Sequence, residues 1–176
     1  MAMVLSACVD APRVDADAPP ADDAVQEVLT YRACSFGNPG ELVPLPRSVP
    51  ADRDSVAAAI AELVKGVNAD EAARGCTSYF SEETRNSLRA VRRSGGGDTV
   101  TVEFRSLMGL VPEVQGARSF LPPGIMAELT WTVFRQFTDV EAIRFSIDGD
   151  EQAFWRWLGG PGTPAQVYTR ADWEQI

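Results

Sequence analysis

The hydrophobic pattern is clearest over residues 122–150, where it changes period. The positions with helical spacing, three or four residues apart, are Met126, Leu129, Val133 and Phe137. The polar positions that fall elsewhere around the same helix are Glu128, Thr132 and Arg135. From Ile143 to Ile147 hydrophobic and polar residues alternate, as in a half-buried strand. The pattern predicts an amphipathic helix that runs into a strand and lies on a sheet.

The N-terminal half predicts two extended segments followed by two helices. Residues 25–34 are rich in strand formers, and residues 41–49 form a second extended piece whose prolines confine it to a sheet edge. A helix over residues 56–66 is capped by Asp52 or Asp54 and ends at Gly66. A capping-box pattern at residues 68–71 then predicts one further helical turn, up to residue 75.

Three consecutive glycines, residues 95–97, invite comparison with a phosphate-binding loop. No lysine follows them, and the alternating residues 99–105 indicate a strand rather than the start of a helix. The glycines therefore predict a hairpin turn. At the other end of the chain, residues 168–173 predict a last strand or a docking tail.

Composition narrows the functional classes. The formal net charge of −9 argues against nucleic acid as a partner, because nucleic acid attracts clustered lysine and arginine. Histidine is absent, so Ser-His-Asp and Cys-His catalysis and imidazole-based zinc sites are excluded. We expect a protein that is not an enzyme and that needs neither a metal nor a cofactor.

The first eight residues resemble the end of a bacterial lipoprotein signal peptide. Leu5-Ser6-Ala7-Cys8 has the form of a lipobox, after which the cysteine is acylated and becomes the new N-terminus. Only seven residues precede Cys8, without a basic region, so we expect the true start codon to lie upstream. The alternative is an incidental cysteine near a disordered terminus.

Residues 9–23 are rich in alanine, proline and aspartate and have almost no large hydrophobic side chain. Such a segment does not bury enough surface to offset the entropy of ordering it, which predicts a disordered acidic tether. We therefore expect three parts: a signal-peptide remnant (1–8), a linker (9–23) and one folded domain (24–176). No apolar run approaches the roughly 20 residues that a transmembrane helix needs.

Two clusters in the folded part carry candidate chemistry. Phe154 to Leu158 is the densest aromatic run, and it predicts either a cap on the core or a platform on which Trp155 and Trp157 stack against a ligand. Asp148, Asp150 and Glu151 form a tight acidic group, which is sufficiently explained as a turn at a strand end. A carboxylate-dependent hydrolase that uses Asp148 and Asp150 is the less favoured hypothesis.

Cys34 and Cys76 remain once Cys8 is assigned to the anchor. In an exported protein they are well placed to pair, whereas in a cytosolic protein both would be buried thiols. They lack the spacing of a metal-binding pair.

Several segments together resemble a known family in their order and spacing. They are Leu42-Val43-Pro44 with Arg47, the helix end Glu62 to Gly66, Gly75 to Ser78, the glycine-rich hairpin with Val100 to Phe104, Leu129 to Phe134, and Val140 to Gly149. In these segments the chain resembles the GerMN domain, a sporulation and spore germination module of bacterial envelope lipoproteins. The resemblance covers residues 28–150.

The resemblance implies an α+β domain in which two main helices pack on one face of a small mixed β-sheet. Related folds are ring-building motifs of envelope assemblies, and members are not known as enzymes. Family members commonly carry an apolar residue where this chain has Cys76, a departure that fits a disulfide to Cys34.

The leading hypothesis is a non-enzymatic, lipid-anchored extracytoplasmic protein. Its partners would be the membrane, through acylated Cys8, and an envelope protein or peptidoglycan. The alternative is a glycan-binding or sensing module that uses Trp155 and Trp157. The sequence leaves the oligomeric state open.

Overall fold

The computed structural model describes residues 24–38, 41–82, 84–94, 96–106, 121–159 and 162–174, with no side chains described for 121–123. The strands are β1 (Val25–Cys34), β2 (Val43–Pro50), β3 (Cys76–Thr77), β4 (Leu88–Arg93), β5 (Thr99–Phe104), β6 (Ala142–Ile147) and β7 (Tyr168–Thr169). The helices are α1 (Ser55–Leu63), α2 (Ala69–Ala73), α3 (Leu121–Phe134), α4 (Glu151–Gly159) and α5 (Arg170–Trp173). The predicted signal-peptide remnant and acidic tether, Cys8 included, lie outside the described residues.

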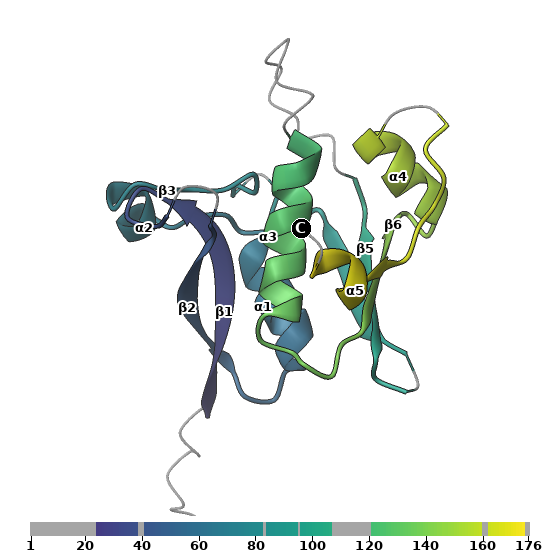
Figure 1. Ribbon diagram of the computed structural model, residues 1–176. Helices are drawn as coiled ribbons and strands as arrows, with labels where there is room; N and C mark the ends of the chain where they lie inside the picture. The colour runs from purple at the N-terminus through teal and green to yellow at the C-terminus, as the bar shows by residue number, and fades with distance from the viewer. Residues whose placement is uncertain are drawn as a thin grey trace, which may run out of the picture.

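Two sheets enclose the two main helices. The first sheet has the strand order β2-β1-β3, and the second has the order β4-β5-β6-β7. Helices α1 and α3 lie side by side between them (Figure 1). The predicted α+β fold is confirmed: the second sheet is small and mixed, and the two main helices, α1 and α3, pack on one of its faces. The first sheet adds a layer on the other side of the helices.

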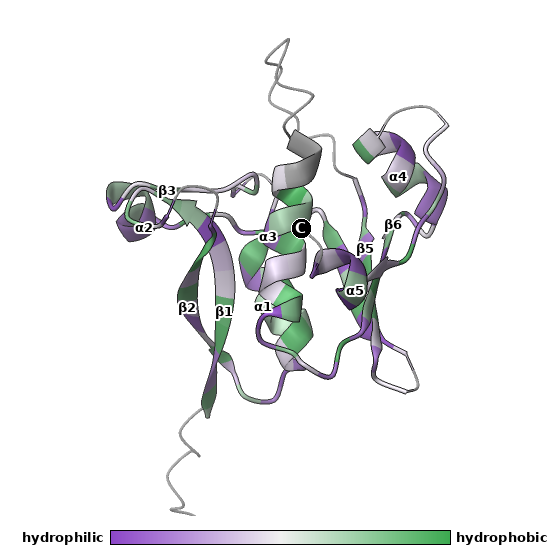
Figure 2. Ribbon diagram, in the orientation of Figure 1, coloured by the Kyte–Doolittle hydropathy of each residue, from purple (hydrophilic) through white to green (hydrophobic). Residues whose placement is uncertain are grey.

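The second sheet and the helices share the main hydrophobic core. β5 and β6 pair in parallel, with Val102 opposite Phe145, while β4 and β7 pair antiparallel at the two edges. Alternate residues of β5 and β6 are buried against α1, α3 and Phe154 of α4. Figure 2 shows hydrophobic residues along both helices where they lie between the sheets.

The first sheet docks on the helices largely through polar groups. Its own hydrophobic cluster is small, with Val28, Val49, Ala58 and Ala59. The Gln136 side chain donates to the Leu29 carbonyl (2.7 Å) and accepts from the Leu29 N–H (3.0 Å), so it pairs with β1 as a neighbouring strand would. The Thr132 hydroxyl accepts from the Tyr31 N–H (3.1 Å). Side chains from α3 and the residues just after it thus bond to the backbone of Leu29 and Tyr31 on the inner edge of β1.

The prediction that α3 is amphipathic was wrong, because the helix has no solvent-facing polar stripe along Glu128 and Thr132. Glu128 is 1% exposed and Thr132 is fully buried, since both face the first sheet. A helix between two sheets is covered on both sides, and its polar residues then bond to the neighbouring strand.

The local signals for helix starts and turns are confirmed. Asp54, rather than Asp52, caps α1 by accepting from the Ala57 N–H (2.8 Å), and Asn68 with Glu71 forms the capping box of α2. The glycine-rich segment turns between β4 and β5, where the Ser94 N–H donates to the Thr99 carbonyl (2.8 Å).

Candidate functional site

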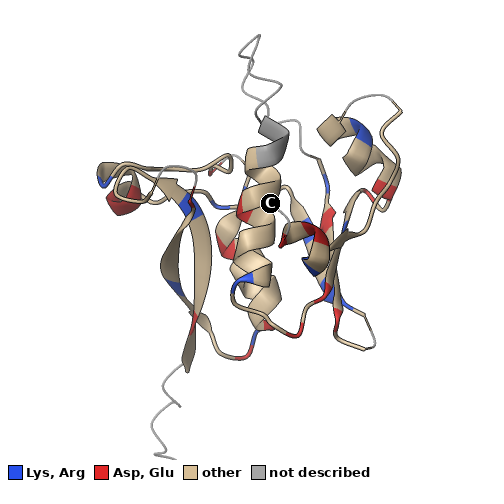
Figure 3. Cartoon of the chain, in the orientation of Figure 1, with Lys and Arg blue, Asp and Glu red and all other residues tan. Residues whose placement is uncertain are grey.

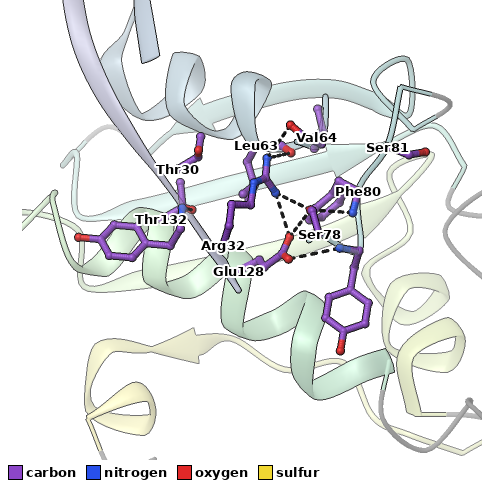
Figure 4. A network of polar contacts seen from close by, with 12 residues as sticks. Thr30, Arg32, Leu63, Val64, Ser78, Phe80, Ser81, Glu128 and Thr132 are labelled. Atoms are coloured by element: carbon purple, nitrogen blue, oxygen red, sulfur yellow. Dashed lines mark hydrogen bonds and ion pairs between the residues drawn. The ribbon is translucent and has the colours of Figure 1, made fainter. Parts of the chain in front are cut away.

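A buried ion pair joins the first sheet to α3. Arg32 of β1 is fully buried, and its Nη1 donates to Glu128 Oε2 at 2.9 Å and to Ser78 Oγ at 2.6 Å (Figure 4). Its Nη2 donates to the carbonyls of Leu63 (2.5 Å) and Gly66 (3.3 Å) at the end of α1. One guanidinium therefore holds β1, α1 and α3 together.

Ser78 and Tyr79 complete the shell of the Glu128 carboxylate. The Ser78 hydroxyl donates to Glu128 Oε2 (2.7 Å), and the Tyr79 N–H donates to Oε1 (3.2 Å). Burial raises the pKa of Glu128, and the Arg32 charge together with these hydrogen bonds opposes the rise. Burial likewise lowers the pKa of Arg32 against the attraction of Glu128.

This network is organised for structure rather than for contact with a ligand. Arg32 and Glu128 expose 0% and 2% of their side chains, so solvent does not reach them. Each guanidinium donor except Nε is bonded within the described residues. The ion pair therefore fixes where the first sheet sits, and a binding site must be sought on the surface.

A second arginine–glutamate pair docks α2 on β2. Arg47 donates through both terminal nitrogens to Glu71, with Nη2 2.6 Å from Oε2. Burial acts to raise the pKa of Glu71, but the hydrogen bonds from Arg47 and the Asn68 N–H outweigh it and lower that pKa below its ordinary value.

Cys34 and Cys76 form a disulfide between β1 and β3. They stand opposite each other in the antiparallel register, next to the Ala33–Thr77 pair. The bond secures a strand of only two residues, two positions before Ser78 of the buried network. The sequence-based pairing of these two cysteines is present in the structure.

A surface cluster combines aromatic rings with an arginine, and we call it the aromatic surface: Tyr31, Trp131, Arg135 and Trp173. The Arg135 guanidinium lies 4.6 Å from the ring centre of Trp131 and 5.2 Å from that of Trp173. The two indoles meet edge to face at 6.2 Å, and Tyr31 packs 6.0 Å from Trp131. Both indoles are half-buried and Arg135 is exposed, whereas Tyr31 is buried (9% exposed), so the accessible part of the cluster is Trp131, Arg135 and Trp173.

The C-terminal part of the aromatic surface is held by Arg170. Its guanidinium donates to the carbonyls of Phe134 (2.9 Å), Phe137 (2.7 Å) and Val140 (2.8 Å) and lies 5.0 Å from the Phe134 ring. These carbonyls belong to the end of α3 and the turn that follows it, where positive charge is favourable. Residues 168–173 are therefore both a short strand and a docking tail, and the tail places Trp173 beside α3.

The structure places one of the two tryptophans of the predicted platform, Trp155, in the core rather than on the surface. Trp155 is 5% exposed, because it packs against Phe145 and Phe154 and donates from its indole N–H to the Gln166 carbonyl (3.1 Å). This corrects the assignment of Trp155 to ligand binding and agrees with the core-cap interpretation. Trp157 is half-buried, 5.8 Å from Phe154, and its binding role stays a prediction.

The acidic group after β6 is a turn. Asp148 and Gly149 both have positive φ (48° and 82°), as in a two-residue hairpin turn, and Ile147 bridges to Asp150. Asp148 pairs with Arg89 and Asp150 with Arg156, all of them well exposed. Within the part of the chain that the structure describes, no three metal-ligating side chains gather at one place. None of the helices described there has the length and apolar character needed to cross a bilayer.

Comparison with known families identifies the domain. Residues 33–153 match the Germane family, described as sporulation and spore germination. This chain belongs to that family. The predicted GerMN resemblance is confirmed. The matched region contains the disulfide, the Arg47–Glu71 pair and α3 with Glu128, and it begins one residue after Arg32.

A solved structure supports the fold of this GerMN domain. The tandem GerMN domains of the sporulation protein GerM from Bacillus subtilis superpose with a TM-score of 0.50 at 20% sequence identity, over 78% of this chain and 43% of that one. The chain thus spans less than half of that structure. A search among curated proteins finds no significant match.

Two features of this GerMN domain were not predicted from the sequence: the buried network and the aromatic surface. An arginine inside the apolar strand β1 and a glutamate among the apolar residues of α3 were the available signals, because an unpaired charge in a core is costly. They are 96 residues apart, so the sequence did not show that they meet.

Proposed function

We propose that this GerMN protein is a non-enzymatic, lipid-anchored extracytoplasmic protein that binds another protein of the bacterial envelope. The aromatic surface carries the binding role. Tryptophan and arginine are among the residues most enriched where proteins bind one another, and here Trp131, Trp173 and Arg135 form one accessible cluster.

The extracytoplasmic location is supported by the disulfide and by the lipobox pattern. Disulfides persist in oxidising compartments, and the bond between Cys34 and Cys76 ties two strands of the folded domain. Leu5 to Cys8 has the residues that lipoprotein processing uses, with acyl chains then holding the product at the membrane.

Cross-linking from the aromatic surface tests the binding role. A photoreactive residue in place of Arg135 in the full-length protein, in intact cells, should give a discrete adduct with an envelope protein. The same residue in place of Glu82, whose side chain is 82% exposed on a different part of the domain, should not. Equal adducts from both positions, or none from position 135, would contradict the role of the aromatic surface.

Intact-mass analysis tests the anchor separately. Protein purified from membranes should begin at an acylated Cys8, and Cys8→Ser should release the protein from the membrane fraction. An unmodified Cys8 in the native product rules out the anchor and leaves the binding test unaffected.

Glycan binding is the second candidate, and it now depends on Trp157. This half-buried indole lies on α4, away from the residues of the aromatic surface. Peptidoglycan fragments should quench tryptophan fluorescence in the wild type and not in Trp157→Leu. An unchanged wild-type spectrum would exclude this candidate.

A further inference from the structure

Arg135 differs from the arginines that hold the fold together. Arg32 and Arg170 direct their guanidinium N–H groups to a carboxylate or to carbonyls of this chain. The guanidinium of Arg135 lies instead over the rings of Trp131 and Trp173. No hydrogen bond or ion pair among the described residues uses it. Its N–H groups therefore have no acceptor in the part of the chain that the structure describes.

The two indoles give this guanidinium a defined place. They meet edge to face, and the central carbon of the Arg135 guanidinium (Cζ) lies 4.6 Å from one ring centre and 5.2 Å from the other. Tryptophan is the best aromatic partner for a cation, and a guanidinium that is already positioned loses less conformational entropy for each hydrogen bond it forms. The aromatic surface therefore presents a planar set of N–H donors that is arranged before any partner binds.

A protein that covers both indoles must also cover Arg135, because the guanidinium lies over both rings. Removing a charged group from water is costly unless the group gains a partner and hydrogen bonds in the complex. Because the described residues supply no acceptor, the partner has to supply one. A carboxylate fits best, since it neutralises the charge and accepts two parallel N–H bonds from one guanidinium.

The acidic side chains of the neighbouring elements do not provide this acceptor. They belong to β1, to the turn after α3, and to α5 with the residue after it: Glu27, Asp139, Glu141, Asp172 and Glu174. None of them forms an ion pair with Arg135, and three are engaged elsewhere, Asp139 with Arg93 (2.5 Å), Glu141 with Arg170 (4.0 Å) and Asp172 with Thr169 (2.6 Å).

The charge around Arg135 is mixed. Figure 3 shows acidic residues on α5 and positive charge at the lower end of α3. These surroundings do not attract an acidic partner over a long distance. The need for a carboxylate arises at contact, when the surface is covered, and the net charge of the chain has no part in it.

We propose that Arg135 binds an aspartate or glutamate side chain of the envelope partner, while Trp131 and Trp173 contact apolar groups that flank this carboxylate. The inference rests on the proposed binding role of the aromatic surface and names the contact that gives it specificity. A main-chain carbonyl of the partner, or its C-terminal carboxylate, is the other possible acceptor, and the experiment below separates these from an acidic side chain.

Cross-linking from a neighbouring position tests the contact with Arg135 in place. The photoreactive residue replaces Ala171, an exposed position two residues before Trp173, in the full-length protein in intact cells. We expect a discrete adduct with an envelope protein, and about tenfold less of it with Arg135→Gln. Arg135→Lys should also lower the yield, because lysine keeps the charge but not the planar donors.

The chain offers a matched control in Arg74. Its guanidinium also has no ion pair among the described residues and lies 5.8 Å from a ring centre, that of Phe36, on a different part of the domain. Arg74→Gln should leave the yield unchanged. The purified Arg135→Gln protein should unfold within about 3 °C of the wild type, so that a lower yield is not caused by unfolding.

A charge exchange identifies the acceptor. Peptide mapping of the adduct gives the segment of the partner that lies against the aromatic surface. Arg135→Glu should lower the yield at least about tenfold, as should arginine in place of the contacting acidic residue of that segment. The two changes together should restore the yield to within about threefold of the wild type.

Several outcomes would overturn the proposal. If no acidic residue of the mapped segment is rescued in this way, the acceptor is a main-chain carbonyl or the C-terminal carboxylate. If Glu174→Gln lowers the yield as much as Arg135→Gln, the acceptor belongs to this chain. An adduct from position 135 but none from position 171 would mean that the partner does not cover Trp173.

The failure of this proposal differs from the failure of the binding role itself. An adduct at position 171 whose yield does not depend on Arg135 overturns the carboxylate contact and leaves the binding role intact. No adduct from either position 135 or position 171 removes both. A photoreactive residue at position 135 still reports contact, because a loss of about tenfold in affinity lowers the yield of an irreversible adduct without abolishing it.

Discussion

The two sheets of this domain are attached to the same helices by different kinds of interaction. The second sheet shares a continuous hydrophobic core with α1 and α3. The first has a small hydrophobic cluster of its own and docks through Arg32, Gln136 and Thr132. The free energy gained by burying apolar surface is roughly proportional to the area buried and does not depend on direction. These hydrogen bonds, in contrast, form only when the sheet and the helix are in one relative position.

The comparison indicates that one side of the helices supplies most of the stability and the other side fixes the position of a sheet. The core under the second sheet supplies most of the buried apolar area, and so most of the stabilising free energy. The polar contacts under the first sheet fix its register against α3, because a shifted strand would leave Arg32 and Glu128 buried without partners. Substitutions on the two sides should therefore behave differently.

On the apolar side, Phe154→Ala should have the largest effect. Phe154 is fully buried between Phe104 and Phe145, with ring centres 6.1 and 4.7 Å away. Removal of a large core ring costs about 3 to 5 kcal/mol of unfolding free energy, measurable by urea denaturation. A loss below about 1 kcal/mol would mean that α4 does not belong to the core.

On the polar side, Arg32→Met should cost about as much, roughly 3 to 5 kcal/mol, because it leaves the Glu128 carboxyl buried without its partner. Here a second substitution should restore stability: Arg32→Met with Glu128→Leu removes both charges and should recover a large part of the loss. No partner substitution should do so for Phe154→Ala. If the double variant is no more stable than Arg32→Met, the network is not the coupled unit described here.

Loss of the disulfide should have a smaller effect. Cys34 and Cys76 are 42 residues apart, and a loop of that size is expected to contribute about 2 to 4 kcal/mol through the unfolded state. Cys34→Ala with Cys76→Ala should therefore lower stability by that amount, and a reductant should destabilise the wild type but not the double variant. Free thiols at both positions in the purified native protein would contradict the bond.

The smallest effect concerns pH and Glu71. The pKa of Glu71 is lowered in the folded protein. Its contribution to the free energy of unfolding is therefore complete above the ordinary pKa of 4.5 and is lost as pH falls through the pKa of the folded protein. Glu71→Gln should be less stable than the wild type at neutral pH, by about 1 to 2 kcal/mol, and the difference should shrink in acid. Glu82→Gln, with an 82% exposed side chain, is the matched control. A difference that stays constant from pH 7 to acid would mean that the charge of Glu71 contributes nothing.

The elements with strong local signals were predictable. The bounds of β1, the capping box of α2 and the glycine-rich turn follow from strand formers, from Asn68 with Glu71 and from three glycines. The second layer was not predictable, because it depends on contacts far apart along the chain. Glu128 was read as part of an exposed helix face, and only the position of Arg32 explains why it is buried.

The candidate sites show the same limit. Trp155 and Trp157 belong to the densest aromatic run, which made them visible in the sequence, yet Trp155 is in the core. Trp131 and Trp173 are separated along the chain by β6, α4 and β7, and Arg170 holds Trp173 beside α3.

The sequence separations of these contacts also suggest an order of assembly. A chain that emerges N-terminus first can close the Cys34–Cys76 bond, 42 residues apart, before α3 exists. The Arg32–Glu128 contact spans 96 residues, and the Arg170 contacts with the end of α3 require nearly the whole chain. The disulfide would then hold β3 beside β1 through the slower, long-range steps. A folding time course in oxidising and reducing buffer should show that the bond changes the folding rate more than the unfolding rate.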